Sequence, residues 1–167
     1  MPRIFAYIAH KNGVPDDSAA ELAAAATKID ASAAPTAIAV GSGADLETCC
    51  AHLQKFYAEV WKISNGALSY PNAELIRNLL IKIIPEGSIM LLSHDHFGID
   101  LAPGLSIKLN AAFVSDVTAV DAIHGPVLKV VRQEFGGQIS AHVNCDISSG
   151  AVITIRPGAF KAVETSN

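Results

Sequence analysis

The chain has 167 residues, of which 50% are hydrophobic and 17% charged, so it can bury one core and is not mainly disordered. Its net charge of −4 gives no support for a nucleic-acid partner. Its apolar runs fall short of the roughly 20 residues of a membrane helix, and its first residues show no signal-peptide pattern. The three cysteines lack the spacing of a zinc site, so we expect buried thiols in a reducing compartment. Together these features predict a cytoplasmic protein without a membrane partner.

Short apolar runs alternate with helical patterns through the first two thirds of the chain. Ser18 and Glu21 have the spacing of a capping box at the start of the first helix. Such alternation predicts parallel βαβ units with helices on both faces of one sheet. We predict strands at Arg3–His10, Thr36–Val40, Tyr57–Ile63, Ser88–Leu92 and Phe113–Ile123, and helices at Ala19–Ile29, Asp45–Gln54, Asn72–Ile84 and Gly98–Leu109.

The last third contains extended runs. Val127–Phe135 ends at Gly136-Gly137, which favours a tight hairpin turn, and Gln138–Cys145 then alternates apolar and polar residues as a half-buried strand does. Ala151–Ile155 is apolar on both faces and is expected to be fully buried. We interpret Val127–Phe160 as an antiparallel platform at the end of the sheet, within a single domain over residues 1–160, followed by a polar tail at 161–167.

Ligands of such sheets bind beyond the carboxyl ends of the strands, near the point where the strand order reverses. The topology therefore predicts a cleft for AMP or a similar adenylate, with no motif to support it. Gly41-Ser42-Gly43 stands between a strand and a helix, but Leu46 breaks the G-x-G-x-x-G pattern, so a tight turn is favoured. The candidate lining residues are Ala9, His10, Gly41, Ser93, His94 and Asp95.

Ser93-His94-Asp95-His96 is the most polar of these loops. His94 and His96 could bind a metal only with a third ligand such as His10 or Asp17, and we favour Asp95 as the N-cap of the next helix. The chain contains no G-x-S-x-G nucleophile motif. We therefore predict no metal site, no catalytic residue and no enzymatic activity.

Two arginines lie on or beside the terminal strands. Arg132 and Arg156 are either solvated edge charges or anchors of an interface. For Arg156 we favour the interface, because its neighbours Ile155 and Phe160 are apolar. We predict a partner interface at Arg132, Arg156 and Phe160.

Residues 98–158 and their immediate flank carry a set of motifs in a characteristic order. The motifs are Gly98-x-Asp100-Leu101-Ala102-Pro103, Val114-Ser115-Asp116-Val117, Arg132 before Gly136-Gly137, and Thr154-Ile155-Arg156-Pro157-Gly158-Ala159-Phe160. This region resembles the N-terminal domain of the electron transfer flavoprotein alpha subunit. It departs from that family at Ile99 and Gly104, where arginine is usual.

The resemblance implies an α/β fold with a mainly parallel, Rossmann-like sheet of the adenine nucleotide alpha hydrolase type, flanked by helices and ending in antiparallel strands. It also implies a partner or scaffold subunit in electron transfer through FAD, packed on a beta-like subunit. The family's FAD-binding domain follows the Arg-Pro-Gly-Ala-Phe motif, so we expect FAD to belong to the partner complex. The alternatives are a homodimer and a stand-alone module that binds AMP or FAD.

Overall fold

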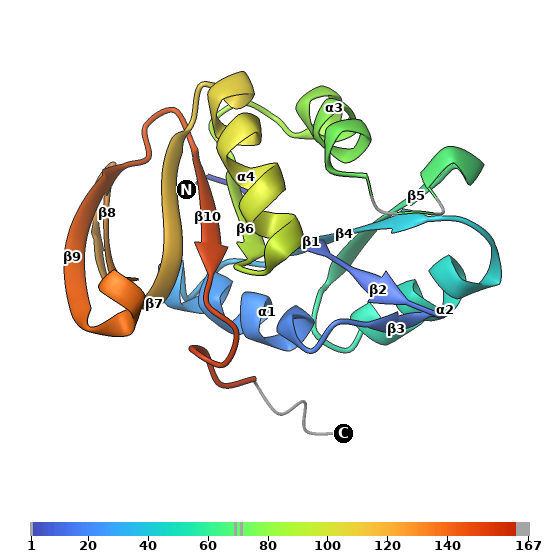
Figure 1. The fold of residues 1–167 in the computed structure, drawn as a ribbon, viewed down its shortest axis with the longest axis horizontal. Coiled ribbons are helices and arrows are strands. Elements are labelled where there is room, and N and C mark those ends of the chain that lie inside the picture. Colours follow the sequence, from blue (N-terminus) through green and yellow to red (C-terminus); the bar gives the residue numbers. More distant parts are fainter. Residues whose placement is uncertain (1, 69, 71, 163–167) are drawn as a thin grey trace.

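The computed structural model describes residues 2–68, 70 and 72–162, and a mixed sheet of eight strands lies at their centre (Figure 1). The strands follow the order β5-β4-β1-β6-β10-β7-β8-β9. Their bounds are β1 Ile4–Ile8, β4 Thr36–Gly41, β5 Glu59–Ser64, β6 Ile89–Ser93, β7 Ala112–His124, β8 Val127–Glu134, β9 Ile139–Asp146 and β10 Ala151–Ile155. The helices are α1 Ser18–Ile29, α2 Gly43–Leu53, α3 Ala73–Ile83 and α4 His96–Leu109, with short 3₁₀ turns η1 Gly66–Leu68 and η2 Phe135–Gly137.

Helices cover the two faces of the parallel part of the sheet. β1 sends Ala6 and Ile8 into the core beneath α1 and α2, and Phe5 and Tyr7 into the core beneath α3 and α4. In Figure 1, α1 and α2 lie below the sheet and α3 and α4 above it. A strand covered on both sides must be apolar on both faces, and all of β1 is buried. The prediction of a mainly parallel sheet flanked by helices is confirmed.

The predicted place of Ala151–Ile155 is wrong. This run does not join an antiparallel platform. As β10 it lies between β6 and β7 and is parallel to both. The expectation that it is fully buried is correct, and it explains the position: only a strand between two helix layers hides both faces from water.

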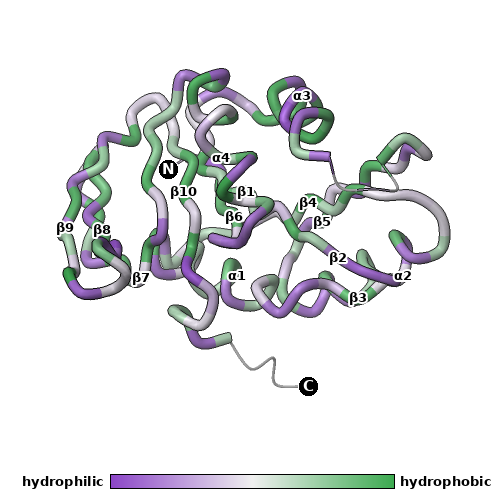
Figure 2. Tube along the Cα trace, in the orientation of Figure 1, coloured by the Kyte–Doolittle hydropathy of each residue, from purple (hydrophilic) through white to green (hydrophobic). Residues whose placement is uncertain are grey.

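The antiparallel part consists of β7, β8 and β9, which we call the β7–β9 extension. β8 pairs antiparallel with β7 and with β9, and the part of the sheet beyond β7 lies outside the helix layers (Figure 1). Figure 2 shows both hydrophilic and hydrophobic residues along β8 and β9, and in β9 the two kinds alternate along the sequence. Along β9 the apolar face is buried at Cys145, whereas Ile139 at the other end is 50% exposed. The predicted alternation is therefore present, and its apolar face is only partly covered.

Of three local predictions, two failed and one is confirmed. The first strand ends at Ile8 and is followed by a small hairpin of β2 (His10–Lys11) and β3 (Val14–Pro15). The hairpin turn predicted at Gly136-Gly137 is confirmed, since β8 pairs antiparallel with β9 and both glycines have a positive φ; the turn η2 also includes Phe135, which has a positive φ as well. The residues of the predicted capping box at the start of α1 make other contacts: the backbone N–H of Ser18 donates to Asp16 Oδ1 at 2.9 Å, and Glu21 Oε2 accepts from the Gly158 N–H at 2.7 Å.

The tail begins beyond the last core contacts. Lys161 and Ala162 have no regular secondary structure, and the rest of the predicted tail lies outside the described residues. In the described ranges, none of the helices combines the length and the hydropathy needed to cross a membrane.

Gly98 lets α4 approach the end of β6. A β-carbon at this position would overlap the backbone oxygen of Ser93, which cannot move aside as a side chain can. We expect Gly98→Ala to lower the free energy of unfolding by about 1–3 kcal/mol in urea denaturation. Gly66→Ala is the control, since a β-carbon there would meet no other described group within 4 Å. Equal effects of the two substitutions would contradict this account.

Candidate functional site

A cavity lies at the carboxyl ends of β1 and β4. Its volume is about 480 Å³, within the usual range of small-molecule pockets. Ala9, His10 and Gly41 line it, so the structure brings together half of the predicted cleft. Apolar walls come from η1, α3 and α4, through Leu68, Ile76 and Phe97.

An aromatic pair separates this cavity from the end of β6. The rings of Tyr7 and Phe97 stack with centroids 5.5 Å apart and an interplanar angle of 24°. Ser93 and Asp95 lie beyond this pair, in a hollow of only about 10 Å³. These two residues of the predicted cleft therefore belong to a space too small for a ligand.

His10 fixes the shape of the cavity and explains the glycine beside it. Its Nε2 lies 3.1 Å from the carbonyl oxygen of Val40, which can only accept, so Nε2 carries the hydrogen. The other ring nitrogen, Nδ1, is buried and has no partner among the described residues. A β-carbon on Gly41 would lie 3.0 Å from the His10 ring. Gly41 is therefore needed for the close approach of an imidazole, and the Gly41-Ser42-Gly43 segment is a tight turn into α2.

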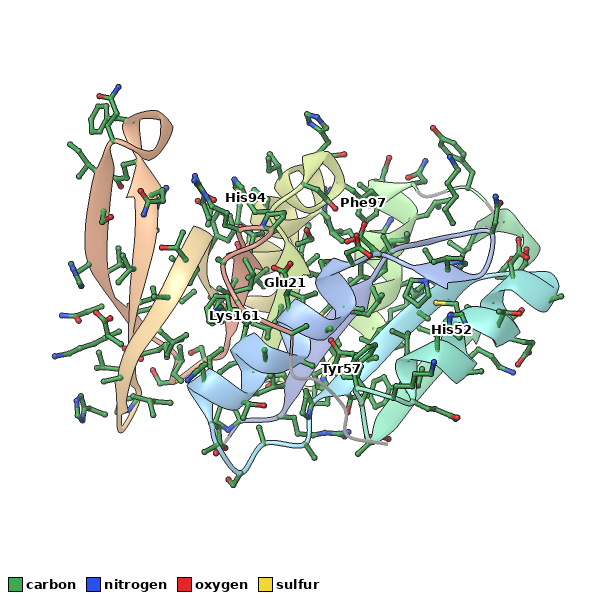
Figure 3. The ribbon with its side chains drawn as sticks, turned by 90° about the horizontal axis from the view of Figure 1, so that it is seen from below. Glu21, His52, Tyr57, His94, Phe97 and Lys161 are labelled. Carbon is green, nitrogen blue, oxygen red and sulfur yellow. The ribbon has the colours of Figure 1, made fainter. Side chains whose placement is uncertain are left out.

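His94 points away from the cavity, toward β10 and β7. Its Nδ1 lies 2.8 Å from the hydroxyl of Thr154, and its Nε2 lies 3.8 Å from Asp116 Oδ1. In Figure 3, His94 lies toward β7 and Phe97 toward α3. The same Thr154 hydroxyl, which is fully buried, accepts a hydrogen bond of 3.0 Å from the Asp116 N–H. His94 therefore belongs to a second polar group, at the ends of β6, β10 and β7.

Asp95 caps α4, as predicted from the sequence. Its Oδ1 accepts a hydrogen bond of 2.8 Å from the Gly98 N–H. His96 begins the helix and is exposed to solvent. Within the described ranges, no three His, Cys, Asp or Glu side chains converge as a metal site would require.

Arg156 forms a two-point ion pair with Asp116. Its Nε and Nη2 donate to the two carboxylate oxygens at 2.9 and 2.6 Å. Asp116 is 13% exposed at its side chain and has a φ of 61°, at a register shift between β7 and β10. The hydrogen bonds from Arg156 lower the pKa of Asp116, and the nearby His94 acts in the same direction. Asp116 was missed as a site residue, although it lies in one of the motifs that the sequence offered.

The other two predicted interface residues differ in their surroundings. The Nε of Arg132 is buried without a hydrogen-bond partner among the described residues and lies 3.8 Å from Glu134 Oε1. Phe160 is 8% exposed and packs within the core under α1. Its ring therefore has little surface left for a partner, whereas Arg132 and Arg156 are both partly accessible.

The fold is a Rossmann-like α/β domain with a mostly parallel sheet that carries an antiparallel extension. The chain belongs to the electron transfer flavoprotein family: the family described as the electron transfer flavoprotein domain matches residues 4–167. This match confirms the resemblance seen in the sequence motifs and extends it over almost the whole chain.

Curated relatives point to the alpha subunit. The chain is 26% identical over 161 residues to the electron transfer flavoprotein subunit alpha of Thermoanaerobacterium thermosaccharolyticum, covering 95% of this chain and 49% of that protein. It is 31% identical over 78 residues to Protein FixB of Clostridium saccharobutylicum, covering 46% and 23%. It is 27% identical over 96 residues to the alpha subunit of Clostridium acetobutylicum, covering 57% and 28%. The chain thus spans about half the length of the first relative and matches less of the others.

The ion pair between Asp116 and Arg156 makes the free energy of unfolding depend on pH in the acidic range. Because the folded pKa of Asp116 is lowered, its stabilising effect is complete above the ordinary pKa near 3.9 and is lost as pH falls through the folded value. We expect Asp116→Asn to be less stable than the wild type at pH 7. The difference should shrink in urea denaturation at about pH 3.

Asp17→Asn is the control for this pH dependence, because the Asp17 side chain makes no capping hydrogen bond. Its stability should follow that of the wild type at both pH values. A difference for Asp116→Asn that stays the same from pH 7 to pH 3 would contradict the assigned role of the ionised carboxylate.

Proposed function

We propose that this protein is an electron transfer flavoprotein alpha-like subunit, which supports electron transfer through assembly with a partner and catalyses no reaction by itself. The observation that carries the proposal is the family match over residues 4–167 together with the partly uncovered β7–β9 extension. The proposed partner is a beta-like subunit, and a second copy of this chain is the alternative.

The β7–β9 extension supplies a surface suited to a partner. Ile139 and Phe135 are exposed at its tip, Arg132 lies on β8, Arg156 follows β10 beside β7, and both arginines are partly accessible. Apolar side chains beside arginines are typical of the centre of protein interfaces. We propose that the partner covers the apolar face of β9 where the helix layers leave it open.

FAD does not fit the cavity of this chain. Its diphosphate would need several positive groups, but the charged residues that line the cavity are Lys11 and Asp45, which have opposite signs. FAD supplies the electron-accepting ring when it is bound, and we propose that the assembled complex holds it. The part of this chain is to present a rigid surface to that complex.

AMP is the second possible ligand, and it is smaller than FAD. Its support is the cavity of about 480 Å³ and the presence there of Ala9, His10 and Gly41. Ser93, His94 and Asp95 lie outside this cavity, so we propose AMP only as a ligand held in addition to the role in assembly.

The proposed location is the cytoplasm. Cys49, Cys50 and Cys145 are all buried free thiols. Burial raises the pKa of each thiol, which keeps it in the unreactive protonated form. Thiols in this state are consistent with a reducing compartment.

Two exposed isoleucines test where the partner binds. Ile139 lies at the tip of β9, and Ile107, which is 77% exposed, lies in the last turn of α4. We expect Ile139→Asp to weaken assembly with a co-expressed beta-like subunit by at least about tenfold, because a charge would be buried in the interface. Ile107→Asp should change the affinity by less than about twofold. Equal affinities of the two variants in titration calorimetry would reject this surface.

Arg156 is tested separately, because it also pairs with Asp116. If the arginine contacts the partner, Arg156→Ala weakens assembly more than Asp116→Asn does, because Asp116→Asn removes the group that holds the guanidinium but leaves its positive charge. If Arg156 serves only the ion pair, both variants change the affinity equally. Sedimentation of the chain alone shows whether the same variants act on a homodimer.

A further inference from the structure

Helix α4 is apolar on its outer side as well as on the side that faces the sheet. Its inner residues Leu101 and Leu105 are buried, as expected for a helix that covers a sheet. On the outer side, Ile99 is 48% exposed, Ile107 is 77% exposed, and Pro103 between them is exposed as well. A helix that is apolar all round is normally covered on all sides, so the outer face of α4 indicates a binding surface.

The three outer residues form one row, which we call the α4 row. They follow one another at intervals of four residues, so they share one face of the helix along about 12 Å. Phe113 adds to this surface: the next residue, Val114, faces the core under α1, so the Phe113 ring lies on the α4 side of the sheet, where it is 40% exposed. The apolar face of β9 lies on the opposite side, since Val143 and Cys145 belong to the core under α1.

Charges beside the α4 row indicate which molecule fits it. Asp100 directly follows the first isoleucine of the row, and Lys108 directly follows the last, so the two ends carry opposite charges. Both residues are exposed, and the Asp100 carboxylate is weakly paired within the described part of the chain, with Oδ1 4.0 Å from Arg77 Nη2. An antiparallel copy of α4 brings each Asp100 beside Lys108 of the other copy, whereas a parallel copy brings like charges together.

We propose that the α4 row binds the same row of a second copy of this chain in an antiparallel dimer with two-fold symmetry. Ile99 packs on Ile107 of the second copy, and Pro103 lies at the two-fold axis. Proline loses no side-chain freedom on burial and isoleucine loses little, so the contact has a low entropic cost. One helix face is smaller than the roughly 800 Å² per partner of a standard interface, so we expect a weak dimer with a dissociation constant on the order of 0.1 mM.

This dimer goes beyond the proposed function and does not depend on it. It needs no beta-like subunit, and it uses the side of the sheet opposite to the apolar face of β9. A chain whose β7–β9 extension is bound to a partner subunit can therefore still dimerise through α4. The dimer would then hold two assembled complexes side by side.

Sedimentation equilibrium of the untagged full chain alone, from about 10 μM to about 1 mM, tests the proposal. We expect the average mass to rise toward that of a dimer. Ile107→Asp should weaken self-association at least about thirtyfold, because each dimer contains the substitution twice and must bury both charges. Ile139→Asp is the matched control, since it changes an exposed isoleucine on β9, and it should alter the dissociation constant by less than about twofold.

An exchange of charges tests the antiparallel arrangement separately from the apolar contact. Asp100→Lys and Lys108→Asp each place like charges together across the two-fold axis, and each should weaken the dimer about fivefold at low salt. The double variant restores opposite charges and should return the dissociation constant to within about twofold of the wild type. A parallel arrangement would leave the single variants unchanged. Unfolding midpoints of all variants check that the fold is intact.

Three results would overturn the proposal. They are a monomer at about 1 mM, self-association that survives Ile107→Asp, and a double charge variant that does not recover. Loss of self-association in Ile139→Asp instead would move the contact between copies to β9. None of these results bears on assembly with a beta-like subunit, where the same two isoleucine variants are expected to have the reverse order of effects.

Discussion

The insertion of β10 between β6 and β7 is the constraint on which the polar edge of the sheet depends. β10 is the last strand in sequence, yet it separates the helix-covered core from the β7–β9 extension. Its end is tied on both sides: the His94 N–H donates to the Ile155 carbonyl at 2.7 Å, and the Arg156 N–H donates to the Val117 carbonyl at 2.9 Å. These backbone bonds place Thr154 and Arg156 where His94 and Asp116 can reach them.

This constraint divides the edge of the sheet into two regions with different chemistry. On one side of β6, Tyr7 and His10 line a cavity, and the buried His10 Nδ1 has no hydrogen-bond partner among the described residues. On the other side, His94, Thr154 and Asp116 satisfy one another and hold Arg156 in place. Only the first region has the volume for a ligand. The second is already paired internally and is better suited to hold a surface in a fixed shape.

The sequence was sufficient for the parallel core because its strands are short, apolar and separated by helical patterns. The cap at Asp95 was predictable for a similar reason, since an N-cap depends on contacts within a few residues. The position of β10 was not predictable in this way: a strand buried on both faces has the same composition whether its neighbours are parallel or antiparallel. The partner of Arg156 is Asp116, forty residues earlier, and only tertiary structure brings the two together.

At the candidate site, too, the sequence could predict only part of the arrangement. Topology predicted that Ala9, His10 and Gly41 lie close together, and they line one cavity, because the carboxyl ends of neighbouring parallel strands share one edge. It could not show that Phe97 would turn back onto Tyr7 and close the space beside Ser93. The capping pattern at Ser18 failed because Glu21 is used by the Gly158 N–H, a contact between opposite ends of the chain.

The pairing of Arg156 with Asp116 is compatible with a role at an interface. A free arginine loses side-chain freedom when it is fixed by a partner, and that loss opposes binding. Here two hydrogen bonds from the guanidinium to Asp116 already hold the side chain, while part of it stays accessible. The Arg156 side chain is thus ordered during folding, and a partner meets its guanidinium in a defined position. The turn that carries Arg156 is anchored in addition by Glu21 and by the buried ring of Phe160, so the whole segment is rigid before any partner arrives.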